Sequence, residues 1–174
     1  RHQILLRGPE TGIQGFYPQP LWYYFIAVGY ALTGGHPIGS VLMLIILNLA
    51  TVAFLMYKIA QKVNPATAIL VGASLQFFWW FYDASRYGFN PFLLVALSIL
   101  LILFLIDFKT YPPAAVPVGL AFHSETAAAV AFAIFYFLAG TLGILKKRLQ
   151  AKTFFLGILI LALFFIPRLI LEIQ

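Results

Sequence analysis

Long apolar runs separated by short polar breaks form the main pattern of the chain after residue 20. The runs are continuous and do not alternate with a period of two, which favours membrane helices over the strands of a β-barrel. A helix needs about 20 apolar residues to cross a bilayer. The pattern predicts membrane segments at 38–57, 66–81, 91–106, 114–145 and 153–171, the last of which is interrupted by Pro167 and Arg168.

The run at 114–145 is too long for one straight span and too short for two full spans. We expect a half-helix that ends near Phe122, a break at residues 123–125 with the sequence "HSE", and a longer helix from about Thr126. The break would place polar side chains beside a membrane helix.

The first 33 residues differ from the rest. Residues 1–20 are polar and rich in Gly and Pro, which predicts a loop. Residues 21–33 are apolar and aromatic but too short to span, which favours an interfacial helix. The sequence therefore predicts an all-α, polytopic transmembrane helix bundle with about five to six membrane segments in 38–171. We expect residues 1–174 to belong to a single transmembrane domain.

Composition supports an integral membrane protein, because 63% of the residues are hydrophobic and only 9% are charged. The net charge is +6, and the basic residues lie beside the apolar runs, so they indicate topology rather than nucleic-acid binding. The positive-inside rule places residues 58–62, 109 and 146–152 in the cytoplasm. The loops at 1–37, 82–90 and 123–125 are then extracytoplasmic. The chain has no cysteine, which excludes a thiolate metal site.

The stretch "SRYGFNPFLL" at 85–94 carries the clearest candidate site. The guanidinium of Arg86 can bind a phosphate through two parallel hydrogen bonds, and a lipid phosphate is the anion that a membrane offers. Asp83, Arg86 and Asn90 would share one face if the segment were helical. Two simpler interpretations stay open. Asp83 and Arg86 also fit a solvated loop pair beside an aromatic belt, and Asn90 fits a cap for a helix that begins at Pro91.

Other polar residues offer weaker candidates. His123 and Glu125 fit a loop in which Ser124 caps the next helix, and they also fit an ionisable pair that faces a cavity. Glu10 lies in the N-terminal loop, where a turn is the simpler role. The spacing of ligand residues predicts no zinc site. The need for a divalent cation is left open, because Glu10 and Glu125 alone do not define a shared ion.

Three segments together resemble one family. They are "GPETGIQGFYPQPLWYYFIAVGYALTGGHPIG", "SRYGFNPFLL" and "GLAFHSETAAA". Their order and spacing resemble membrane glycosyltransferases of the GT-C type, which include protein mannosyltransferases and aminoarabinose transferases. The resemblance covers nearly the whole chain. It departs from the family at Phe89, where Trp is usual, at His123, which is displaced, and at Glu125, where His or Lys is commoner.

The resemblance implies an inverting enzyme that moves a sugar from a polyprenyl-phosphate donor to an extracytoplasmic lipid, glycan or protein. Arg86 would bind the donor phosphate, and the cavity would be lined by Glu10, Asp83, Asn90, His123 and Glu125. The acidic catalytic base of such enzymes would precede Arg1, so residues 1–174 are not expected to catalyse alone. The implied location is a bacterial or archaeal plasma membrane.

Two other functions stay open. The chain also fits a non-catalytic membrane subunit or lipid-binding scaffold. A transporter ranks lowest: broken membrane helices often mark transport sites, but the sequence contains no internal repeat.

Overall fold

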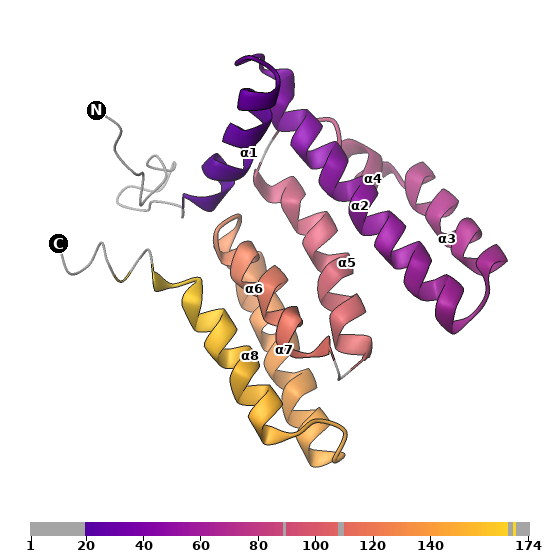
Figure 1. Cartoon of the computed structure of the whole chain (residues 1–174), viewed down its shortest axis with the longest axis vertical. Helices are drawn as coiled ribbons and strands as arrows, with labels where there is room; N and C mark the ends of the chain where they lie inside the picture. Colours follow the sequence, from indigo (N-terminus) through magenta and orange to yellow (C-terminus); the bar gives the residue numbers. More distant parts are fainter. Residues whose placement is uncertain (1–19, 89, 108–109, 167–168, 170–174) are drawn as a thin grey trace. The chain divides into compact units, whose positions relative to one another are not determined.

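The computed structural model describes residues 20–88, 90–107, 110–166 and 169. These residues form helices and no strand, which confirms the all-α class for this part of the chain. The helices in chain order are α1 (Leu21–Leu32), α2 (Ile38–Lys62), α3 (Pro65–Phe77), α4 (Trp79–Ala84), α5 (Leu93–Ile106), α6 (Ala115–Phe122), α7 (Thr126–Leu145) and α8 (Ala151–Leu163) (Figure 1). Two 3-10 helices, η1 (Asn90–Phe92) and η3 (Pro112–Ala114), precede α5 and α6.

The chain divides into two compact units. One consists of residues 25–100 and contains α2, α3 and α4; we call it the α2–α4 unit. The other consists of residues 1–24 and 101–174 and contains α6, α7 and α8; we call it the α6–α8 unit.

Helix α1 confirms the predicted short helix and ends in a glycine turn. The N–H of Gly35 donates to the carbonyl oxygen of Tyr30 at 2.7 Å, and Gly34 and Gly35 have φ of 63° and 87°. Glycine adopts this left-handed conformation at little steric cost, and the bond satisfies a carbonyl that the helix end leaves open. The turn brings Gly29 of α1 into direct backbone contact with Gly39 of α2.

Helices α2 and α3 lie side by side and are joined by a short turn (Figure 1). The side chain of Asn64 caps α3, because its Oδ1 accepts from the N–H of Thr67 at 2.7 Å, and Pro65 takes the first helical position. The predicted end of α2 near residue 57 is wrong. The helix continues through Lys58 and Lys62, since basic side chains are favourable near a helix C-terminus.

The predicted segment at 66–81 is not one helix. Helix α3 ends at Phe77, Phe78 adopts an extended conformation with φ −74° and ψ 116°, and α4 begins at Trp79. The N–H of Phe78 still donates to the carbonyl oxygen of Leu75, but its extended ψ turns the chain out of the helix. The 13 residues of α3 extend about 20 Å, which is shorter than the bilayer hydrocarbon.

The predicted break at residues 123–125 is confirmed, because α6 ends at Phe122 and α7 begins at Thr126. Helix α8 begins at Ala151 and ends at Leu163, residues 164 and 165 form a turn, and residues 166 and 169 are helical again. The predicted extent of the last segment to residue 171 lies outside the described residues. Pro167 has no N–H to donate to the carbonyl of Leu163, so the sequence itself removes the next helical bond.

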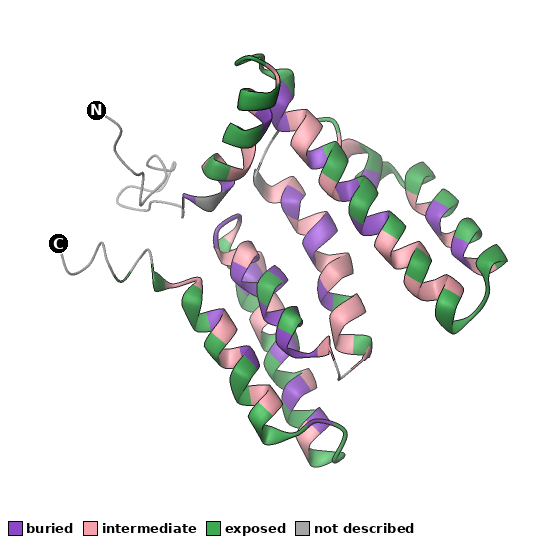
Figure 2. Ribbon diagram, in the orientation of Figure 1, coloured by how far each residue is buried: buried purple, intermediate pink, exposed green. Residues whose placement is uncertain are grey.

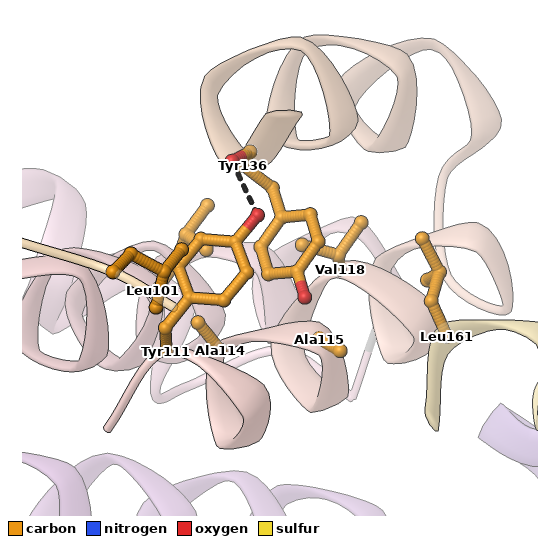
Figure 3. Packing of buried hydrophobic residues seen from close by; sticks show 8 residues of the cluster. Leu101, Tyr111, Ala114, Ala115, Val118, Tyr136 and Leu161 are labelled. Carbon is orange, nitrogen blue, oxygen red and sulfur yellow. Dashed lines mark hydrogen bonds between the residues drawn. The ribbon is translucent and has the colours of Figure 1, made fainter. Parts of the chain in front are cut away.

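Two stacked tyrosines form the centre of the α6–α8 unit (Figure 3). The ring centroids of Tyr111 and Tyr136 are 4.5 Å apart, and the planes are inclined by 21°. The hydroxyl of Tyr111 donates to the backbone carbonyl oxygen of Tyr136 at 2.9 Å. Gly140 and Gly157 leave room for the rings, because a Cβ at either position would overlap a tyrosine hydroxyl.

Two helices of the described chain are long and apolar enough to cross a membrane. These are α2 and α7, with mean hydropathies of 2.4 and 2.2. Only 33% and 22% of their most apolar 18-residue stretches are buried, whereas the core helix of a water-soluble protein is mostly buried (Figure 2). The apolar helices α3, α5 and α8 have 13 or 14 residues each, so the larger number of membrane segments stays a prediction.

Candidate functional site

Arg86 lies in the turn that ends α4. The N–H of Ser85 donates to the carbonyl of Tyr82 at 3.1 Å, and the N–H of Arg86 donates to that of Asp83 at 3.0 Å. Asp83 is therefore on the helix, Arg86 is in the turn, and Asn90 opens η1. Asp83, Arg86 and Asn90 therefore do not share one helical face, because α4 ends between Asp83 and Arg86.

The side chain of Arg86 is exposed and rests on an aromatic ring. Its guanidinium carbon is 5.1 Å from the ring centroid of Tyr82, a cation–π arrangement. Tyr82 in turn contacts Trp79, with centroids 6.0 Å apart. Because the Arg86 side chain is exposed, the N–H donors of its guanidinium remain accessible to an anion. The arrangement presents a cation to an anion at an aromatic surface.

The segment that carries this cation is rich in exposed aromatic side chains. Those of the α3–α4 break and the following turn are Phe77, Phe78, Trp79, Trp80, Tyr82 and Tyr87. In contrast, Phe81 and Ala84 are buried and fix α4 within its unit. The exposed rings provide apolar surface in the same segment as Arg86.

The turn is held by a polar residue that sequence reasoning missed, Asn48 of α2. Its Nδ2 donates to the Oγ of Ser85 at 2.8 Å, and its side chain is 1% exposed. An amide in the apolar middle of a 25-residue helix was the signal available, because polar groups inside membrane helices are costly and often functional.

The turn makes a second contact with α2, through Gly88. Gly88 lies directly against the side chain of Ser40, which is buried and donates to the carbonyl of Pro37 at 3.2 Å. Ser85 contacts α2 at residue 48 and Gly88 contacts it at residue 40. The turn at residues 85–88 therefore contacts α2 at two positions that are about 12 Å apart along the helix axis.

His123 lies in the α6–α8 unit and is buried, with 5% of its surface exposed. Its Nε2 is 2.9 Å from the carbonyl oxygen of Phe164, so this nitrogen carries the proton and donates it. Its Nδ1 is buried with no hydrogen-bond partner among the described residues. Burial lowers the pKa of His123 below its ordinary value, and the bond to Phe164 acts in the opposite direction. The ring joins the α6–α7 break to the end of α8.

The structure describes the remaining candidate residues, Glu125, Glu10 and Asn90, only in part. Glu125 is half-buried and takes the N-cap position of α7 without a side-chain cap bond, so the cap lies one residue later than the predicted Ser124. Glu10 and the predicted loop 1–20, except Pro20, lie outside the described residues, as does the side chain of Asn90. The capping role of Asn90 stays a prediction.

The described residues contain no group of three His, Asp or Glu side chains that could hold a metal ion. The need for a divalent cation therefore stays open. In comparisons with known proteins, no family model, curated protein or solved structure matches the chain.

Proposed function

We propose that the chain is part of a multi-pass membrane glycosyltransferase that takes a sugar from a polyprenyl-phosphate donor. The acceptor is an extracytoplasmic lipid, glycan or protein, and Arg86 binds the donor phosphate. The observation that carries the proposal is the exposed guanidinium of Arg86, which lies 5.1 Å from the ring centroid of Tyr82 in a turn held against an apolar helix.

A lipid phosphate fits this position better than a soluble anion. An exposed cation beside apolar helices is costly unless an anion or water reaches it. A polyprenyl phosphate supplies both a phosphate for the guanidinium and an isoprenoid chain for the exposed rings of Trp79 and Trp80. The resemblance of residues 85–94 to GT-C glycosyltransferases points to the same ligand.

The proposed orientation follows from the two long apolar helices. Helix α2 carries Lys58 and Lys62 near its C-terminus, and α7 is followed by residues 146–148, "KKR". The positive-inside rule places both C-termini in the cytoplasm, so both helices run inward from the outer face. The α6–α7 break is then extracytoplasmic. The chain between α2 and α5 returns to the outer side by way of α3, the break at Phe78 and α4.

The reaction would break the bond between the anomeric carbon and a phosphate oxygen. The acceptor oxygen or nitrogen attacks the anomeric carbon from the opposite face, which inverts it, and its proton passes to a base. The electron pair of the broken bond stays on the departing polyprenyl phosphate. Arg86 would stabilise this charge as it develops, which is the usual task of a fixed cation at a leaving group.

The test uses the full-length chain, which is the complete polypeptide with the segment expected to precede Arg1, in lipid nanodiscs with a radiolabelled polyprenyl-phosphate sugar. We expect Arg86→Gln to reduce transfer by about a hundredfold or more, the usual loss when one charge-stabilising donor is removed. Arg86→Lys should retain part of the activity, because an ammonium keeps the charge but not the two-pronged geometry.

Arg148→Gln is the matched control, since it removes one exposed arginine in the turn after α7. It should leave transfer unchanged. Near-normal transfer by Arg86→Gln would refute the phosphate role of Arg86. Donor binding by the full-length chain without any transfer would instead indicate a lipid-binding subunit.

A further inference from the structure

Asn48 is a buried amide in the middle of an apolar helix, and burial is costly for a polar group without hydrogen bonds. Its partner is remote in sequence, since Ser85 lies 37 positions further along the chain. A bond over this separation joins two helices of the α2–α4 unit, and it ends on the residue directly before Arg86.

The orientation of the amide follows from the bonds of Ser85. The hydroxyl of Ser85 donates its only proton to the carbonyl oxygen of Phe81 at 3.0 Å. Its Oγ can therefore only accept from Asn48, which must present its Nδ2. The Oδ1 of Asn48 is left buried with no hydrogen-bond partner among the described residues. The amide is thus used for one directed bond, to the turn that carries Arg86.

The two contacts of the turn with α2 define its position along the axis of that helix. Ser85 is beside Asn48 and Gly88 is beside Ser40, eight residues nearer the start of the helix. At 1.5 Å per residue the end of α4 is about 12 Å from the level of Ser40. If α2 crosses the bilayer, the turn that carries Arg86 begins, at Ser85, below the outer end of the helix.

We propose that Asn48 is a positioning residue for Arg86. By binding Ser85 it holds residues 85–88 against α2, and so it sets the depth at which the guanidinium meets a lipid phosphate. The inference rests on the proposed function for the identity of the ligand. The position of the turn itself can be measured without any ligand.

The absence of cysteine in the sequence allows a direct test. A nitroxide label on Tyr87→Cys, in the full-length chain in nanodiscs, reports the mobility and depth of the turn. We expect a restrained label below the lipid headgroups in the parent chain. Asn48→Leu and Ser85→Ala should each increase its mobility at least about twofold, and the double variant should be no worse than Asn48→Leu alone, because the two residues share one interaction.

The reciprocal exchange, Asn48→Ser with Ser85→Asn, should restore part of the restraint, which a general packing defect would not show. Ser74→Ala is the control. Its hydroxyl is exposed on α3 and donates to the carbonyl of Leu70 in its own helix, so the label should not respond. Asn48→Leu makes α2 more apolar, so a loss of membrane insertion would not explain its effect.

Binding to nanodiscs of phosphatidylcholine with polyprenyl monophosphate separates this inference from the proposed function. We expect Asn48→Leu to weaken binding about tenfold, as for other coupled pairs. An unchanged label in Asn48→Leu overturns the positioning role. A mobile label with unchanged phosphate binding also overturns it, if Arg86→Gln abolishes binding. If Arg86→Gln has no effect on binding while Asn48→Leu frees the label, the phosphate role of Arg86 fails and the restraint of the turn by Asn48 stands.

Discussion

The hydroxyl of Tyr111 donates to the backbone carbonyl oxygen of Tyr136 at 2.9 Å, while the hydroxyl of Tyr136 is buried without a partner among the described residues. The two rings stack, so both contribute apolar contact, but only one hydroxyl contributes a hydrogen bond. The pair therefore offers an internal comparison in which the same chemical change has different consequences.

We expect Tyr111→Phe to lower the free energy of unfolding by about 1 kcal/mol, because it removes a buried hydrogen bond and keeps the stack. Tyr136→Phe should be neutral or stabilising, since it removes a buried hydroxyl that has no described partner. Denaturant unfolding of the purified full-length chain in detergent measures both. Equal losses in the two variants would contradict the assigned hydrogen bond.

Gly157 makes room for the ring of Tyr136. A Cβ at this position would overlap the hydroxyl oxygen of Tyr136, and the next nearest atoms are 3.3 Å away. We expect Gly157→Ala to cost about 1–3 kcal/mol through overpacking. The combination Gly157→Ala with Tyr136→Phe should recover most of this loss in the same unfolding experiment. A double variant as unstable as Gly157→Ala alone would show that the hydroxyl is not the obstacle.

His123 makes stability depend on pH. Burial lowers its folded pKa below the ordinary 6.5, so the unfolded chain binds a proton more readily than the folded chain. The free energy of unfolding should therefore fall as the pH is lowered from about 6.5 toward the folded pKa, and it should be unaffected by His123 above that range.

His123→Gln tests this, because the Gln amide can still donate to the carbonyl of Phe164 but does not titrate. Melting temperatures from pH 7 to pH 5 should fall less steeply for this variant than for the parent. Identical slopes for the parent and His123→Gln would rule out the burial effect at His123.

Asn64 should stabilise the start of α3 through its cap. Replacing a capping Asn with Ala typically costs about 1 kcal/mol. We expect Asn64→Ala to lose about this much stability, while Asn64→Asp should keep it, because a carboxylate oxygen can still accept from the N–H of Thr67. Hydrogen exchange at the amides of 66–69 localises the effect. Protection that does not change in Asn64→Ala would mean that the cap does not hold the first turn.

Much of the fold could be predicted where polar residues interrupt apolar runs. The break at residues 123–125 was predictable because a His, a Ser and a Glu stand between two apolar segments. The break at Phe78 was not, because it lies in an unbroken run of aromatic residues with no Gly or Pro. The end of α2 was misplaced for the opposite reason: Lys58 is polar, but the helix continues for about one more turn to Lys62, whose charge is favourable at a helix C-terminus.

The candidate site shows a similar limit. Arg86 stands out in the sequence, because a charge beside apolar runs is uncommon. Asn48 does not, since one amide hardly changes the hydropathy of a 25-residue helix and its partner is 37 positions away. Pairing over that distance is a property of the packed α2–α4 unit, which periodicity and local spacing do not predict.

Photo-crosslinking can show whether a polyprenyl phosphate binds at Arg86. A polyprenyl phosphate with a photoreactive group in its first isoprene unit would be irradiated with the full-length chain in nanodiscs. Mass spectrometry then locates the modified peptide. We expect labelling within residues 77–88, loss of labelling in Arg86→Gln, and competition by unmodified polyprenyl phosphate. Labelling elsewhere, or labelling that persists in Arg86→Gln, would contradict binding at Arg86.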